Sequence, residues 1–321
     1  MSYISVIIPN YNRGWCIEET IKSVVRVSDN ILLEVLVVDN GSNDESKSVI
    51  DKLRSVDPRI KWIEASHLPQ NGNCARNLGA EYSSGDYLQF LDSDDLIAYG
   101  KLESQLKLLQ GGDVYDVATS GWSILDENGD CQNVKMKRHW HNYDNSLDLL
   151  VEMWSNSEWF FPGCWLISKE LYEKVGKWTE DLQADQDGEF FARILLAGDK
   201  VHFDGERGFV RRKHSGDHVG NRGSISSVNS RFKAWDIIQQ KLLDKENSRR
   251  VKVAISRRLH EVAYRCGTTE NGWLRWASEK QKTIGINDFG LCKPYLLNIM
   301  TLLFGFEKGV NLRRRLLGSG R

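Results

Sequence analysis

Short apolar runs alternate with helical patterns over the first hundred residues of the chain. The apolar runs predict strands, and they lie at residues 4–8, 33–38, 60–65 and 87–91. Between the first two runs, Ile17, Ile21 and Val24 recur at the spacing of one helix face, and further helices are expected up to about Leu53 and over residues 73–84. Near-continuous apolar strands that alternate with helices indicate a parallel sheet covered on both faces.

The pattern becomes less regular beyond residue 112. Residues 228–265 are rich in Lys and Arg and predict one long helical segment with a solvated face. Other helices are expected at residues 99–111, 145–155, 168–176 and within 183–199. These differences divide the chain into three predicted parts, residues 1–112, 113–227 and a helical extension over 228–321.

Polar side chains follow the predicted strands, and ligands of parallel sheets bind at the carboxyl ends of the strands. Asp92, Asp94 and Asp95 come directly after an apolar run, although each pair of like charges costs roughly 1 kcal/mol even in water at ~4 Å. Two explanations stay open. The carboxylates belong to a loop with an N-cap for the helix at 99–111, or they hold a divalent cation together with a phosphate group.

Composition narrows the class of protein. The 321 residues are 40% hydrophobic and carry a formal net charge of −1, which argues against nucleic acid as a partner. The chain contains neither of the Gly-rich motifs that bind dinucleotides or the phosphates of P-loop proteins. Six scattered cysteines without a CxxC pair and a start that is unlike a signal peptide predict a cytoplasmic protein. No apolar run reaches ~18 residues, so no spanning helix is expected.

Four segments in this order resemble the N-terminal half of family 2 glycosyltransferases with the GT-A fold. They are SVIIPNYNR (5–13), VLVVDNGSNDES (35–46), NGNCARNLGA (71–80) and YLQFLDSDD (87–95). Residues 163–194 resemble the acceptor half of these enzymes, and the likeness fades after about residue 227. The resemblance implies an α/β nucleotide-diphospho-sugar transferase fold, with a mostly parallel, Rossmann-like sheet flanked by helices. The first two predicted parts then become its nucleotide-sugar-binding and acceptor-binding halves.

The resemblance also implies residues that bind the nucleotide-diphosphate sugar. In the family, the first loop contacts the nucleotide, and the matching positions in this sequence are Pro9, Tyr11 and Arg13. Asp39 lies where an aspartate recognises the base, usually uracil, and Arg76 lies in the donor-binding helix.

The DxD motif of the family matches Asp92, Ser93 and Asp94. The resemblance implies Mn²⁺ or Mg²⁺ as cofactor, with Asp94 as the favoured direct ligand and Asp92 nearer the ribose. A histidine of the segment VRRKHSGDHVG would complete the metal or diphosphate site, and His214 is a better match than His218.

Asp187 matches the second position of the family's ED pair and is the expected catalytic base, since an aspartate near its usual pKa of ~4 is ionised at pH 7. Gln186 departs from the first position of that pair, and Asp185 remains a competitor for the role.

His139 and His141 are interpreted as surface residues. The acceptor site is expected around Trp159, Phe160, Phe161, Gly163 and Trp165, where aromatic faces can cover the C–H surface of a sugar, and ordinary core packing is the alternative.

The expected activity is metal-dependent, inverting transfer of a sugar, with a UDP-sugar as the favoured donor. The acceptor is expected to be a saccharide or a lipid-linked saccharide of cell-surface polysaccharide synthesis. Two other functions stay open, a nucleotidyltransferase that makes a nucleotide sugar and a module that binds sugar nucleotides or glycans without turnover.

The C-terminal segment, residues 284–321, has about a dozen mostly apolar residues before Arg313, Arg314 and Arg315. That length is too short to span a bilayer, but it suits peripheral contact with anionic lipids at the inner face of the cell membrane. The alternative is that Leu296 and Leu303 pack on the catalytic domain or on a second subunit of a homo-oligomer.

Overall fold

The computed structural model describes residues 2–26, 31–214, 224–266, 271–286 and 308. By its contacts the chain divides into two compact units. Unit 1 comprises Met1–Ser146, Phe160–Glu180 and Arg193–Asp217, and unit 2 comprises Leu147–Trp159, Asp181–Ala192 and His218–Arg321. The boundaries expected after residues 112 and 227 do not coincide with this division, because segments 147–159 and 181–192 group with the C-terminal helices.

A mostly parallel sheet forms the centre of unit 1. In the described part of the chain it has seven strands in the order β10-β6-β9-β4-β1-β2-β3. The strands are β1 (Tyr3–Asn10), β2 (Leu32–Asp39), β3 (Ile60–Glu64), β4 (Tyr87–Phe90), β6 (Val117–Thr119), β9 (Trp165–Ser168) and β10 (Val201–Phe203). Strand β9 runs antiparallel to both β4 and β6. Nearly every side chain of β1 and β2 is buried, as expected for strands covered on both faces.

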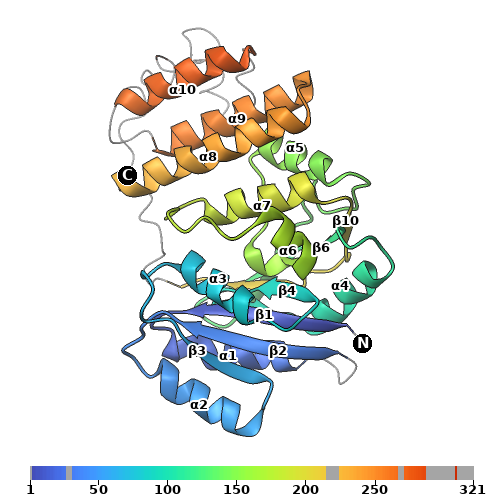
Figure 1. Ribbon diagram of the computed structural model, residues 1–321, viewed down its shortest axis with the longest axis vertical. Helices are drawn as coiled ribbons and strands as arrows, with labels where there is room; N and C mark the ends of the chain where they lie inside the picture. The colour runs from blue at the N-terminus through green and yellow to red at the C-terminus, as the bar shows by residue number, and fades with distance from the viewer. Residues whose placement is uncertain (1, 27–30, 215–223, 267–270, 287–307, 309–321) are drawn as a thin grey trace. The chain divides into compact units, whose positions relative to one another are not determined.

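Helices cover the two faces of this sheet (Figure 1). Helix α3 (Gly72–Tyr82) packs on β1 and β2 from one side, and α1 (Gly14–Val25) and α2 (Ser46–Val56) lie on the other. Gly79 permits the close approach of α3, because a Cβ at this position would lie 2.5 Å from Ile7 Cγ2. Helices α4 (Lys101–Gln110) and α6 (Lys169–Val175) contact the β6–β9 part of the sheet.

A smaller sheet in unit 1 brings distant segments of the chain together. Its strand order is β5-β11-β7-β8, and the strands are β5 (Leu96–Ile97), β7 (Trp122–Leu125), β8 (Cys131–Asn133) and β11 (Phe209–Arg212). Strand β11 pairs antiparallel with β5. The segment after residue 208 therefore lies beside the loop that follows β4.

Unit 2 is helical. Helix α9 (Arg249–Cys266) packs against α8 (Ile225–Lys245) and α10 (Asn271–Ile284) (Figure 1). The helical segment expected over 228–265 is thus two helices, interrupted at residues 246–248. The unit also takes in most of α5 (Ser146–Asn156) and the first half of α7 (Gln186–Ala197).

Within the described ranges, no helix combines the length and apolar character that crossing a bilayer requires. The predicted membrane-contacting segment lies almost wholly outside the described residues, as does His218.

Candidate functional site

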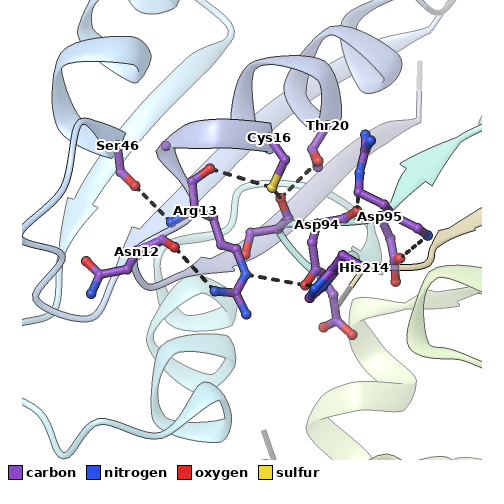
Figure 2. A network of polar contacts seen from close by, with 12 residues as sticks. Asn12, Arg13, Cys16, Thr20, Ser46, Asp94, Asp95 and His214 are labelled. Atoms are coloured by element: carbon purple, nitrogen blue, oxygen red, sulfur yellow. Dashed lines mark hydrogen bonds and ion pairs between the residues drawn. The ribbon is translucent and has the colours of Figure 1, made fainter. Parts of the chain in front are cut away.

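Each of the three carboxylates after β4 has a different partner in unit 1. Asp92 Oδ1 accepts a hydrogen bond from Arg76 Nη2 at 2.6 Å. Asp94 Oδ2 lies 3.3 Å from Arg13 Nε and 3.0 Å from His214 Nε2 (Figure 2). Asp95 Oδ1 accepts the backbone N–H of residue 212 at 2.8 Å. Cations and a backbone donor thus offset the clustered negative charge.

The N-cap explanation for these carboxylates is wrong. Helix α4 has Gly100 as its N-cap residue, with a left-handed φ of 84° and no side-chain cap. Asp95 is instead buried, and burial together with the charges of Asp94 and Asp92 raises its pKa well above the usual value.

Helix α1 fixes the backbone of the acidic loop. The carbonyl oxygen of Ser93 accepts hydrogen bonds from Thr20 Oγ1 at 3.0 Å and from Cys16 Sγ at 3.5 Å (Figure 2). Burial and the charge of Asp94 raise the pKa of Cys16 to about 12, so its thiol remains a donor at neutral pH. The loop therefore has a defined position relative to the first turns of α1.

Arg76 is held from three sides. Its side chain, 8% exposed, bonds Asp92, and its Nη1 donates to Asn73 Oδ1 at 3.3 Å. Its guanidinium also lies 4.7 Å from the ring centroid of Trp178, within cation–π range. This arginine presents a positive charge of fixed position beside the acidic loop.

The predicted base-recognition residue, Asp39, ends β2 and is buried. Its Oδ1 accepts hydrogen bonds from Asn10 Nδ2 and Ser42 Oγ, and its Oδ2 accepts the backbone N–H of Ser42 at 2.9 Å. A carboxylate has about four acceptor sites, so room remains for about one further donor. Tyr11 follows β1 directly with its side chain 42% exposed, and Pro9 is half-buried within β1.

Residues that sequence reasoning missed connect β11 to α1. Arg212 donates from Nη2 to Glu19 at 2.5 Å and from Nε to the carbonyl oxygen of Asp94 at 3.0 Å. The ring of Trp15, itself exposed, lies edge-on to His214 with centroids 5.4 Å apart. The basic segment at 210–214 was a signal, because Arg211, Arg212 and Lys213 place three cationic side chains next to His214 in the sequence.

In unit 2 one of the two candidate bases, Asp185, forms an ion pair with an arginine. Arg258 Nη2 donates to both carboxylate oxygens of Asp185 at 2.6 Å, and Arg258 Nη1 donates to Glu261 at 2.9 Å. Burial opposes the charge of Arg258, but Asp185 and Glu261 hold its pKa above the ordinary value. Asp187 is half-buried in the first turn of α7. Asp185 is therefore committed to an ion pair, which weakens its candidacy as the base.

Part of the predicted metal site is assembled. Among the described residues, no three His, Cys, Asp or Glu side chains are placed to hold a metal together. Asp94 and His214 are in contact, whereas Asp92 is turned towards Arg76. Mg²⁺ commonly binds through one or two carboxylates and completes its coordination with water and substrate phosphates. Asp94 and His214 fit an ion of that kind, and the predicted three-residue set does not form.

The predicted acceptor-covering aromatics are partly core. Phe160 and Trp165 are buried, and the half-buried ring of Phe161 lies 5.0 Å from the Arg211 guanidinium. Gly163 is packed so closely that an added Cβ would lie 2.3 Å from the ring of Phe209. In unit 2, the side chain of Trp159 is exposed.

The interpretation of His139 as a surface residue is wrong. Its side chain is 1% exposed, and its ring packs edge-on to Phe160 at 4.8 Å. His141 is exposed, as expected.

A family model described as Glycosyl transferase family 2 matches residues 5–176, more than half of the chain. The chain is 36% identical over 112 residues to the GalNAc(5)-diNAcBac-PP-undecaprenol beta-1,3-glucosyltransferase of Campylobacter jejuni, a match covering 35% of this chain and 36% of that protein. It is 26% identical over 241 residues to the glycosyltransferase GlyG of Streptococcus pneumoniae, covering 70% and 75% of the two chains. The chain spans less than half the length of the first relatives it matches.

The fold resembles that of S. aureus TarS, residues 1–349, in complex with UDP-GlcNAc. The TM-score is 0.74 at 16% identity, and the match covers 99% of this chain and 92% of the other. This likeness confirms the expected α/β fold class.

Proposed function

The chain belongs to glycosyl transferase family 2, and from that membership we propose that it transfers a sugar from a nucleotide-diphosphate donor to an acceptor hydroxyl. The observation that carries the proposal is the arrangement at the carboxyl end of β4. There, Asp92 and Asp94 lie within hydrogen-bonding distance of three cationic or titratable side chains, Arg76, Arg13 and His214. Such a mixed cluster suits a diphosphate, whose negative charge the cations can balance.

UDP is the proposed nucleotide part of the donor. Asp39 has about one acceptor site left after its bonds to Asn10 and Ser42, and an N–H of the base can donate to it. The exposed ring of Tyr11 supplies an apolar face for the base. The fold likeness to TarS, which was crystallised with UDP-GlcNAc, supports the same donor class.

Positive charge at the leaving diphosphate is the proposed main source of catalysis. Mn²⁺ or Mg²⁺ held by Asp94 and His214 would supply Lewis-acid stabilisation of the leaving group. Arg76 adds a charge whose position is set by Asp92 and Trp178. A charge fixed before the reaction costs no reorganisation as the bond breaks.

Asp187 is the proposed base. Its carboxylate accepts the proton of the acceptor hydroxyl while the hydroxyl oxygen bonds to the anomeric carbon of the sugar and the bond to the diphosphate breaks. Attack opposite to the leaving group inverts the anomeric configuration. The engagement of Asp185 by Arg258 supports Asp187 in this role.

The proposed acceptor is a saccharide, soluble or linked to a lipid, in the synthesis of a cell-surface polysaccharide. The name of the Campylobacter relative describes a glycan on undecaprenol diphosphate, which supports a lipid-linked acceptor. Such an acceptor would place the enzyme at the inner face of the cell membrane.

A thermal-shift screen of nucleotide sugars with and without Mn²⁺ tests the donor. A ligand at 100 times its Kd adds ~2.7 kcal/mol to the unfolding free energy, so a UDP-sugar should raise the melting temperature more than CDP- or GDP-sugars. Mass spectrometry of mixtures with candidate acceptors then detects the product. The absence of any shift across the panel would contradict the proposed activity, and a shift without product would indicate a binding module.

A further inference from the structure

One carboxylate oxygen of the acidic loop has two nitrogen neighbours. Arg13 Nε lies 3.3 Å and His214 Nε2 lies 3.0 Å from the same atom, Asp94 Oδ2. Among the described residues, the Arg13 guanidinium makes one further hydrogen bond, from Nη1 to the carbonyl oxygen of Asn12 at 3.3 Å. Both Arg13 bonds exceed the usual length of an N–H···O bond, and the side chain is 22% exposed.

The other two arginines at the acidic loop are held more firmly. Arg76 bonds Asp92 at 2.6 Å and lies against the Trp178 ring. Arg212 bonds the carbonyl oxygen of Asp94 and the carboxylate of Glu19 at 3.0 and 2.5 Å. Among the described cations of this loop, Arg13 is thus the one whose side chain is released at the lowest cost.

The backbone of Arg13, by contrast, is fixed. Its N–H donates to Ser46 Oγ at 3.2 Å (Figure 2). Its carbonyl oxygen accepts the N–H groups of Cys16 and Ile17 at 3.0 and 2.9 Å as α1 begins. A change in its contacts therefore involves rotation of the side chain alone, about an anchored Cα.

We propose that Arg13 is an exchangeable cation, which occupies Asp94 Oδ2 in the free protein and moves to the donor diphosphate when a divalent cation takes that oxygen. The inference rests on the proposed function. A guanidinium and a divalent ion repel each other at one carboxylate oxygen, so Arg13 weakens metal binding before the donor arrives. Once a diphosphate is present, the same charge favours the assembled complex. Metal and nucleotide then strengthen each other's binding reciprocally.

The test measures Mn²⁺ affinity by calorimetry with and without saturating UDP. Without UDP, Arg13→Gln should bind Mn²⁺ about three- to tenfold more tightly than the unmodified protein, as expected for removal of a positive charge some ångströms from the ion. With UDP the gain should vanish or reverse, and UDP affinity at saturating Mn²⁺ should fall. Arg13→Lys retains the charge and should return the Mn²⁺ affinity to near the unmodified value.

Arg54→Gln is the matched control. It removes the same charge from an exposed position of α2, where Arg54 Nη1 lies 3.3 Å from Asp51 Oδ1, and it should leave both affinities unchanged. Melting temperatures of all variants check that the fold is retained.

The outcomes separate the two proposals. The exchange is overturned if Arg13→Gln binds Mn²⁺ no more tightly than the unmodified protein without UDP. It is also overturned if the variant gains the same Mn²⁺ affinity with and without UDP. In either case, binding of UDP by the unmodified protein leaves the proposed function standing. An unmodified protein that binds neither UDP nor UDP-sugars overturns the proposed function and the exchange with it.

Discussion

Replacing Asp185 by Asn should mainly lower the stability of the fold, whereas replacing Asp187 by Asn should mainly lower the turnover rate. The two residues are only two positions apart in the sequence. Asp185 and Arg258 form an ion pair in which the side chains are 15% and 16% exposed. Asn at position 185 removes the negative charge and leaves Arg258 with Glu261 as its remaining acidic partner. The Asp187 side chain lies in the first turn of α7 and is half-buried.

The magnitude follows from the burial of the pair. Removing one partner of a fully buried ion pair costs ~3–5 kcal/mol. Here Asn retains one acceptor oxygen, Glu261 still neutralises Arg258, and Asn tolerates the left-handed φ of 61° at position 185. We therefore expect a loss of about 1.5–3 kcal/mol in unfolding free energy. That loss corresponds to a melting temperature lower by about 3–12 °C.

Asp187→Asn should behave in the opposite way. Asn keeps the size of the side chain and one acceptor oxygen, and the lost charge in the first turn of a helix is worth ~0.3–1 kcal/mol through the helix dipole, so the melting temperature should fall less than in Asp185→Asn. Removal of the proton acceptor should lower kcat by ~10²-fold or more. The affinity for UDP should stay the same, because the proposed donor-binding residues are unchanged.

The assay compares both variants with the unmodified protein by thermal unfolding, by UDP titration and by initial rates at saturating acceptor. Arg258→Gln is a control from the other side of the ion pair and should reproduce the stability loss of Asp185→Asn. If Asp185→Asn abolishes turnover while Asp187→Asn remains active, the base is Asp185. If Asp185→Asn melts at the unmodified temperature, the reasoning from the ion pair is refuted.

Three further predictions concern the donor, the metal and the membrane. Asp94→Ala should abolish transfer with little change in melting temperature, and EDTA should inhibit the unmodified enzyme; full activity in either case contradicts the metal assignment. Ser42→Ala removes the hydrogen bond from Ser42 Oγ to Asp39 Oδ1 and leaves the backbone hydrogen bond to Asp39 Oδ2 in place. The carboxylate of Asp39 is then held less firmly, so UDP affinity should fall about two- to tenfold, as measured by calorimetry, while Mn²⁺ affinity without UDP is unchanged. The full chain should sediment with anionic liposomes at low salt and a chain ending near Asp288 should not; if both remain in solution, the C-terminal segment packs on protein.

Local sequence signals were sufficient for the large sheet and its loops. The strands predicted at 4–8, 33–38, 60–65 and 87–91 correspond to β1–β4, with ends that differ by at most two residues. The helix expected at 73–84 is α3. Apolar periodicity predicts such elements because a strand or helix must bury one or both of its faces. That burial requires apolar residues at regular spacing among neighbours in the sequence. The acidic motif could be located for the same reason, since it directly follows a buried strand.

Only the tertiary structure decided which partner each carboxylate has. The contact between Asp94 and His214 joins residues 120 positions apart, and the Asp185–Arg258 pair spans 73 positions. The antiparallel insertion of β9 and the pairing of β11 with β5 likewise have no local signature. The burial of His139 also depends on distant aromatic residues. Such contacts arise when whole elements pack together. The packing depends on burial, charge and chain entropy summed over segments that are distant in the sequence, so a short stretch of sequence does not predict it.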